Sequence, residues 1–236
     1  LAAVFGLPFK SPIKTFVNLP SGKGFLKAGV LNKELCARYS ARYFELSKIG
    51  ASPDWLKKAL KSCGVQSINS VVDAMNYAML MTGQPLHAFD ADELDGGIVV
   101  RSAKKGEKII TLDDRHIELA PDVLVIADEK RTLAIAGIKG GMYAGVTGKT
   151  RRIIIEGANF DATNIFKSSR ALKLQTDASL RFAHDLSPAL VGIGLDFATD
   201  VLTALGAILK DTIDIYPRKA TEKVISFDAL KYKKII

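Results

Sequence analysis

The sequence has few cysteines and no long hydrophobic run. Its two cysteines, Cys36 and Cys63, are too few and too isolated for a zinc site or a disulfide framework, which favours a reducing cytoplasm. No apolar stretch approaches the ~20 residues that span a bilayer, and the N-terminus lacks the charged and apolar regions of a secretory signal. We therefore expect a cytoplasmic protein without a membrane partner.

The chain also lacks an initial methionine, low-complexity segments and internal repeats. Its first residue is Leu1, which indicates a piece of a longer protein. At 236 residues with 48% hydrophobic content, it is long enough for one large or two small domains with a real core. Lys plus Arg exceed Asp plus Glu, 33 against 25, and this surplus fits either solubility or a phosphate-bearing partner.

The most informative stretch of the chain is Asn69–Asp90. Its apolar residues recur at helical spacing on more than one face, with Ser70 placed to cap the start. Gly83 and Pro85 predict the end of this helix, so we expect the residues through His87 to form a loop. Because a helix of this kind is normally central to a domain, it would present His87 from a rigid base.

Two elements precede this helix. The residues RYSARYFE at 38–45 alternate between polar and aromatic types, which predicts a strand with one solvent-facing side. A second helix is expected to begin at Ser52 and Pro53, which suit its cap and first turn. Its predicted buried stripe includes Trp55 and Cys63.

From Gly97 to Gly157 the hydrophobic period becomes that of strands. Short runs rich in branched residues, separated by Gly, Pro or Asp turns, predict mostly antiparallel strands. The remaining expected elements are a helix over 160–174 capped by Asp161, a long helix from Ser187 to Gly206, and a strand over 208–215. The predicted fold class is therefore α+β, with mixed, mostly antiparallel, sandwich-like sheets packed with several helices.

Two glycine-containing segments suggest phosphate binding only superficially. Gly148-Lys149-Thr150 matches the end of a P-loop, but an earlier glycine is missing and a strand follows where a helix is needed. Gly137, Gly140 and Gly141 lack dinucleotide-binding spacing. They fit either a turn after a strand or a wall that lets a ligand approach backbone amides.

Three polar residues are candidate site residues, each with an ordinary structural alternative. His87 is either a satisfied structural histidine or a catalytic group. Glu156 ends a run of three isoleucines and the predicted strand, so its carboxylate needs a partner, for which Arg151 or Arg152 is the simplest candidate. Thr176 fits a helix cap as well as a functional position.

Several segments together resemble one family. They are RYSAR at 38–42, VVDAMNYAMLMTGQPLHAFD at 71–90, AGIKGG at 136–141, IIIEGANFD at 153–161, SSRAL at 168–172 and TDASLRF at 176–182. In order and spacing they resemble the editing domain of the beta subunit of bacterial phenylalanyl-tRNA synthetase. The resemblance covers about residues 30–215. It implies a domain over 30–216, preceded by a linker and module tail in 1–29 and followed by the truncated start of another module in 217–236.

The resemblance also implies an activity, which is the hydrolysis of tyrosine wrongly attached to the phenylalanine tRNA. The family's catalytic positions fall on His87, Glu156 and Thr176, and its substrate-binding positions fall on Asn76, Gly137, Gly140 and Ala178. No metal or cofactor is implied for this piece, whereas ATP and magnesium are expected for the parent ligase. The implied partners are the acceptor end of tRNA(Phe) and the alpha subunit of the synthetase.

Two alternatives remain open at this point. The domain could be a structural and tRNA-contacting module without deacylase activity, or a free-standing deacylase for another misacylated tRNA. The chain also departs from the family's pattern: it has Ala183, His184 and Asp185 in place of a Glu-Arg-Gly run, and apolar or small residues after Gly141. These departures leave the implied pocket positions unchanged.

Overall fold

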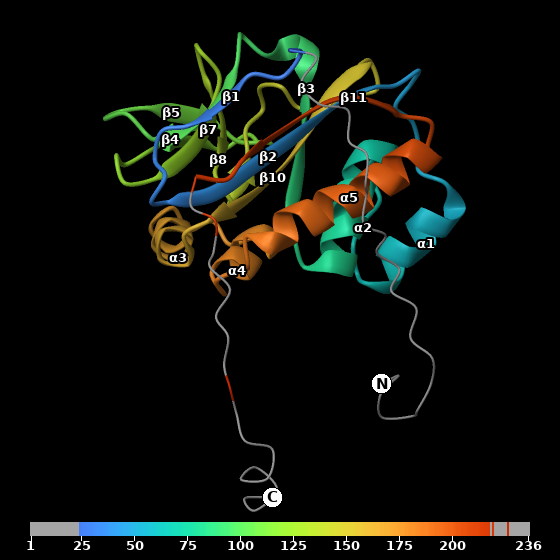
Figure 1. The fold of residues 1–236 in the computed structure, drawn as a ribbon. Helices are drawn as coiled ribbons and strands as arrows, with labels where there is room; N and C mark the ends of the chain where they lie inside the picture. The colour runs from blue at the N-terminus through green and yellow to red at the C-terminus, as the bar shows by residue number, and fades with distance from the viewer. Residues whose placement is uncertain (1–23, 218, 220–225, 227–236) are drawn as a thin grey trace, which may run out of the picture.

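A computed structural model describes residues 24–217, 219 and 226 of the chain (Figure 1). Of the linker and module tail expected over 1–29, residues 1–23 lie outside the described residues, as does most of the module expected over 217–236, whereas Ala28 and Gly29 belong to a strand. Among the residues that are described, no helix is both long and apolar enough to cross a membrane.

Three β-sheets and five α-helices make up the described part. The four-stranded sheet has the order β11-β2-β10-β3, the five-stranded sheet has the order β1-β4-β7-β8-β9, and β5 pairs with β6. The strands are β1 Ala28–Val30, β2 Cys36–Glu45, β3 Leu86–Asp90, β4 Ile98–Ser102, β5 Lys108–Ile110, β6 His116–Glu118, β7 Leu124–Ala127, β8 Thr132–Ile135, β9 Lys139–Gly140, β10 Arg152–Phe160 and β11 Ile208–Ile215. The helices are α1 Asp54–Ser62, α2 Ser70–Thr82, α3 Ala162–Ala171, α4 Asp177–Phe182 and α5 Ala189–Ala204, with a short 3₁₀ turn at Ala91–Glu93.

The elements form three layers, and the four-stranded sheet is the middle one (Figure 1). One face of this sheet packs Tyr39, Ala41 and Ile154 against side chains of the five-stranded sheet. Its other face packs Ile153 and Ile155 against α2 and α5. All strand pairs among the described residues are antiparallel except β1 with β4. The predicted α+β class with mostly antiparallel, sandwich-like sheets is confirmed.

Strand β2 differs from its prediction because both of its faces are covered. Ser40, Arg42 and the residues around them are buried, so the expected solvent-facing side does not exist. Arg42, only 3% exposed, donates to the Leu195 carbonyl at 2.8 Å and pairs with Asp196 of α5. Residues of α5 accept the hydrogen bonds of the Arg42 guanidinium. A strand that carries polar side chains can therefore be buried on both faces in the middle of the sheet.

The predicted helix from Ser52 is α1, but its buried side is narrower than expected. Leu56 and Leu60 are fully buried, whereas Trp55 is 48% exposed and Cys63 is exposed, so the prediction was wrong for these two residues. Trp55 instead packs edge-on against Tyr77 of α2, with ring centroids 5.6 Å apart. Helix α1 packs against α2 rather than against a sheet. Two buried leucines are enough for that contact.

Helix α2 ends as predicted, but its start and its continuation differ. Asn69, not Ser70, is the cap, because its side chain accepts hydrogen bonds from the Val71 and Val72 amides. Gly83 takes the left-handed conformation at φ 80°, which confirms the predicted end. Only Gly83, Gln84 and Pro85 separate the helix from β3, so Leu86 and His87 of the expected loop belong to a strand instead.

The elements after β9 agree more closely with the sequence predictions. Asp161 caps α3 by accepting from the Asn164 amide at 2.7 Å, although Phe160 belongs to β10 rather than to the helix. Helix α5 begins after Pro188, and β11 has the predicted bounds. The sequence analysis missed the short strands β1 and β9, whose two or three residues carry no readable period.

Candidate active site

Glu156 and His87 lie on the last two strands of the four-stranded sheet, β10 and the edge strand β3. Strand β10 pairs with β3 so that Glu156 lies directly opposite His87. Cross-strand partners project from the same face of a sheet, so both side chains face the five-stranded sheet. The prediction that Glu156 ends its strand was wrong, because β10 continues through Gly157 to Phe160.

A cavity of about 100 Å³ lies between the two sheets at this point. Glu156 and His87 line it, together with Pro85, Leu86, Ile126, Ala134, Ile135, Gly137, Ile138, Lys139, Gly140, Phe160, Ala178 and Phe182. Its size is of the same order as an apolar cavity of ~150 Å³ that holds one benzene ring. The cavity therefore has room for a single aromatic ring and little more.

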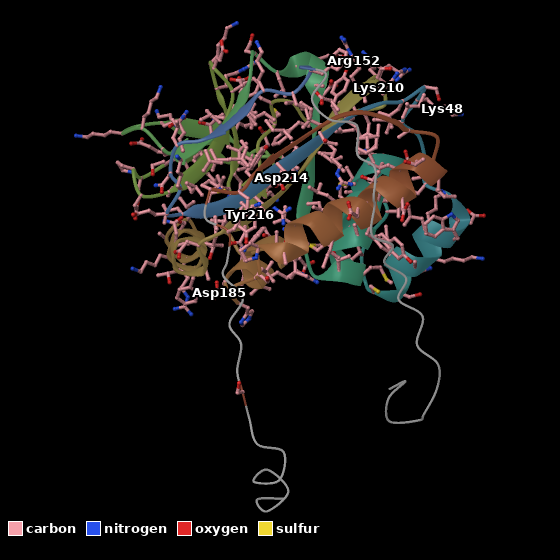
Figure 2. The ribbon with its side chains drawn as sticks, in the orientation of Figure 1. Lys48, Arg152, Asp185, Lys210, Asp214 and Tyr216 are labelled. Carbon is pink, nitrogen blue, oxygen red and sulfur yellow. The ribbon has the colours of Figure 1, made fainter. Side chains whose placement is uncertain are left out.

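The Glu156 carboxyl has an unsatisfied oxygen. The side chain is 6% exposed, and its Oε2 atom has no hydrogen-bond partner in the part of the chain that the structure describes. Neither proposed arginine partner reaches it: Arg152 pairs with Asp92 at the outer end of β10 (Figure 2), and Arg151 donates to backbone carbonyls. Burial raises the Glu156 pKa from 4.5 to about 8, so Glu156 carries a neutral carboxyl group at pH 7.

His87 is neutral at the same pH for the same physical reason. Burial lowers its pKa from 6.5 to about 4. Its ring contacts Phe89 edge-on, with centroids 4.7 Å apart. Gly140 makes this position possible, because a Cβ atom there would lie 2.8 Å from His87 Cε1. The cavity thus presents two neutral groups that can each donate and accept a hydrogen bond.

These pKa values predict how stability depends on pH. The folded chain holds the Glu156 proton more tightly than the unfolded chain, so this stabilising contribution is full below about pH 4.5 and is lost as the pH rises to about 8. We expect Glu156→Gln, which has no such proton, to gain on the order of 3 kcal/mol relative to the parent between about pH 5 and pH 9. Unfolding by urea at both pH values measures this difference. Identical pH profiles for the two proteins would contradict the buried, unpaired state of Glu156.

Gly137 and Thr176 lie on the side of the cavity opposite β3. Gly137 has φ +67° and sits against Phe160 and Phe182, and its N–H has no hydrogen-bond partner among the described residues. Thr176 caps α4, and its hydroxyl donates to the Ile138 carbonyl at 2.9 Å. That hydroxyl does not line the cavity. It ties α4 to the turn that carries Gly137.

Asn76 and Ala178 complete the set of expected site residues. Ala178 lines the cavity from α4. Asn76 lines a neighbouring cavity of about 370 Å³, which shares Leu86 and His87 with the first. The structure therefore brings His87, Glu156, Gly137, Gly140 and Ala178 into one cavity, places Thr176 behind its wall, and places Asn76 in the adjoining cavity.

The sequence analysis missed the aromatic walls of the cavity. Phe160 and Phe182 pack with ring centroids 5.2 Å apart and close one side. Phe160 lies on the same face of β10 as Glu156, and Phe182 lies one helical turn after Ala178. The two-residue period of a strand would have placed Phe160 on the face of Glu156. The four-residue spacing of a helix would have placed Phe182 beside Ala178. Among the described residues, no group of three or more His, Cys, Asp or Glu side chains could hold a metal ion.

The chain belongs to the B3/4 domain family, whose characteristic pattern matches residues 35–207. Curated relatives are phenylalanine–tRNA ligase beta subunits. The chain is 43% identical to the subunit from Dehalococcoides mccartyi strain CBDB1 over 92% of its own length and 27% of the subunit's. For the Aquifex aeolicus VF5 subunit the values are 42%, 98% and 30%. The chain thus spans less than a third of either relative, and the resemblance stated from its motifs is confirmed.

A solved structure shares the fold. It is the crystal structure of an N-terminal fragment of the phenylalanyl-tRNA synthetase beta subunit from Pyrococcus horikoshii, with a TM-score of 0.53. The match covers 94% of this chain and 62% of that fragment at 13% sequence identity. At this identity the similarity concerns the arrangement of the elements alone.

Proposed function

We propose that this chain is the editing domain of a phenylalanine–tRNA ligase beta subunit, and that it hydrolyses tyrosine mistakenly esterified to tRNA(Phe). The observation that carries the proposal is the unpartnered Glu156 carboxyl, which lines a cavity of single-ring size opposite His87. A phenol fits this cavity and supplies the missing hydrogen-bond partner. The domain would extend over residues 30–216.

The proposed selectivity rests on one hydroxyl group. Phenylalanine in the cavity would exclude water and leave the Glu156 oxygen unpaired, which costs about 1–3 kcal/mol. Tyrosine would place its phenol between Glu156 and His87, and no charge has to be buried because both groups are neutral at pH 7. A synthetic pocket that rejects an added hydroxyl only weakly, by on the order of a hundredfold, needs a second site with this opposite preference.

The ester would lie at the glycine side of the cavity. A water molecule attacks the ester carbonyl carbon, the bond to the ribose oxygen breaks, and the water's proton passes to that oxygen. We assign stabilisation of the negative charge that develops on the carbonyl oxygen to the N–H of Gly137, which lines the cavity and has no hydrogen-bond partner among the described residues. We assign no general base, because holding a water beside an activated ester already supplies a large part of the acceleration.

We assign Thr176 a positioning role, since its hydroxyl holds the turn that carries Gly137. Thr176→Val removes this bond and the helix cap, which costs about 1 kcal/mol of stability. We expect kcat for tyrosyl ester hydrolysis to fall about tenfold, about 1.4 kcal/mol, with KM nearly unchanged. Thr176→Ser keeps the hydroxyl and should restore kcat. Equal kcat values for the serine and valine variants would contradict this role.

Hydrolysis of charged tRNA tests the proposal against its main alternative. The chain is incubated with tyrosyl-tRNA(Phe) and phenylalanyl-tRNA(Phe), and release of each amino acid is followed. We expect tyrosine to be released at least tenfold faster than phenylalanine. The absence of preferential tyrosine release would instead favour a structural and tRNA-contacting module without deacylase activity.

The wider assembly follows from the same proposal. The parent ligase would pair this beta subunit with an alpha subunit and bind the acceptor end of tRNA(Phe). We assign the ATP and magnesium expected for aminoacylation to other parts of that ligase. The residues proposed for editing in this chain use neither.

A further inference from the structure

A second hollow lies on the outer side of α4, between α3 and α4. It measures about 480 Å³ and is lined by Phe166, Ser169, Arg170, Lys173, Leu174, Gln175, Ser179, Leu180, Ala183 and His184. We call it the α3–α4 groove. Its volume falls in the range of ~300–1,000 Å³ that is typical of small-ligand sites. No residue of the proposed editing cavity lines it.

An exposed aromatic ring and an arginine form one wall of the groove. Phe166 is 46% exposed, and the Arg170 guanidinium lies 4.6 Å from its ring centroid. Arg170 has no carboxylate partner among the described residues. By contrast Arg131, which lies over Tyr143, is paired with Asp95. The Arg170 cation is therefore available to an external anion, and the exposed part of the Phe166 ring that the guanidinium does not cover is available for stacking.

The charges of the groove all have one sign. Its lining includes the cations Arg170 and Lys173 but no carboxylate, and Asp185 projects from the end of α4 outside that lining (Figure 2). Lys173 has φ +53°, a left-handed conformation that favours glycine at the end of a helix. A lysine at this position gives up backbone stability and places a cation at the groove.

We propose that the α3–α4 groove binds single-stranded RNA, with a base stacked on Phe166 and phosphates on Arg170 and Lys173. Stacking faces interleaved with cations are the usual means of holding a single strand without reading its sequence. Helix α4 links the groove to the cavity, because Ala178 and Phe182 line the cavity while Leu180 lines the groove. The RNA is then the strand that leads to the ester, and this part of the inference rests on the proposed function.

The two sites are separated by little more than one helix. A helix with its side chains is about 10 Å across, so a strand seated in the groove lies within reach of the cavity. A peptide or a small anion would use the cations alone, whereas a nucleic acid strand uses both the cations and the aromatic face. The α3–α4 groove offers cations together with an aromatic face, and this combination favours RNA over a peptide or a small anion.

Binding to a short fluorescein-labelled single-stranded RNA ending in CCA tests the inference, by fluorescence anisotropy with the full chain. We expect Phe166→Ala and Arg170→Ala each to weaken binding about five- to hundredfold. Lys173→Gly should reduce the slope of log affinity against log salt by about 0.7. Because glycine relieves the left-handed strain, its melting temperature should not fall, which separates loss of contact from loss of fold.

Matched controls lie on α1, at the opposite end of the molecule from α3 (Figure 1). Trp55→Ala removes an equally exposed aromatic ring and Lys58→Ala an exposed cation, and both should bind RNA as the parent does. The inference is overturned if the full chain binds no RNA at low salt, or if duplex RNA competes as well as the single strand. It is also overturned if the control variants lose as much RNA affinity as the groove variants.

Ester hydrolysis on the same proteins separates this inference from the proposed function. Tyrosyl ester hydrolysis by the parent, combined with normal RNA binding by the groove variants, would overturn the groove and leave the editing proposal intact. RNA binding that depends on the groove, without any tyrosyl preference in hydrolysis, would overturn the editing proposal and leave the groove intact.

Discussion

Replacing Glu156 with alanine is expected to abolish the preference for tyrosyl over phenylalanyl esters. The carboxyl is the only group we assign to the phenol's hydroxyl besides His87, and it has an oxygen free for that purpose. Leaving this buried oxygen unpaired is worth about 1–3 kcal/mol, so the ratio of kcat/KM values should fall about 5- to 150-fold. Competition between the two charged tRNAs in one reaction measures the ratio directly.

The control for this prediction is Glu118→Ala, which removes an exposed carboxylate on β6. It should leave the tyrosyl preference unchanged. Melting curves of both variants show whether the cavity variant remains folded. A folded Glu156→Ala protein that still prefers tyrosyl esters would show that the phenol is recognised elsewhere.

Filling the cavity is expected to stop hydrolysis altogether. Ala178 lies at the cavity wall, and a tryptophan there would occupy most of a space of about 100 Å³. We expect Ala178→Trp to reduce tyrosyl ester hydrolysis at least hundredfold, about 2.7 kcal/mol in the barrier. The measurement is single-turnover release of tyrosine with enzyme in excess. RNA binding in the α3–α4 groove should persist, because Ala178 does not line it.

The matched control is Ala171→Trp, at the exposed end of α3. It introduces the same side chain where no cavity is filled and should keep most of the activity. Unchanged tyrosine release by a folded Ala178→Trp protein would mean that the ester is hydrolysed at a different place on the molecule.

The sequence indicated several residues that line the cavity, but not their geometry. His87 and Glu156 belong to segments that carry the family resemblance, yet one was expected in a loop and the other at a strand end. Both lie inside strands, because β3 and β10 pair with each other along the middle sheet. Strand register is set by contacts between distant segments, so no local pattern could place these two side chains opposite each other.

The covered faces of β2 illustrate the same limit. Alternation of polar and aromatic residues normally indicates a solvent-facing side, but Arg42 is buried and satisfied by α5, about 150 residues later in the chain. Local sequence signals were sufficient to predict helix ends and caps, because these depend on neighbouring residues. The glycine that ends α2 and the aspartate that caps α3 act within one turn of their own helices.

Binding of non-hydrolysable substrate ends tests the central claim most directly. Adenosines carrying tyrosine or phenylalanine through a 3′-amide bond are titrated into the chain and into Glu156→Ala, and the four affinities are measured by calorimetry. We expect the tyrosyl amide to bind the parent at least tenfold more tightly than the phenylalanyl amide, about 1.4 kcal/mol, and the variant to bind both alike. Equal affinities in the parent would contradict this expectation.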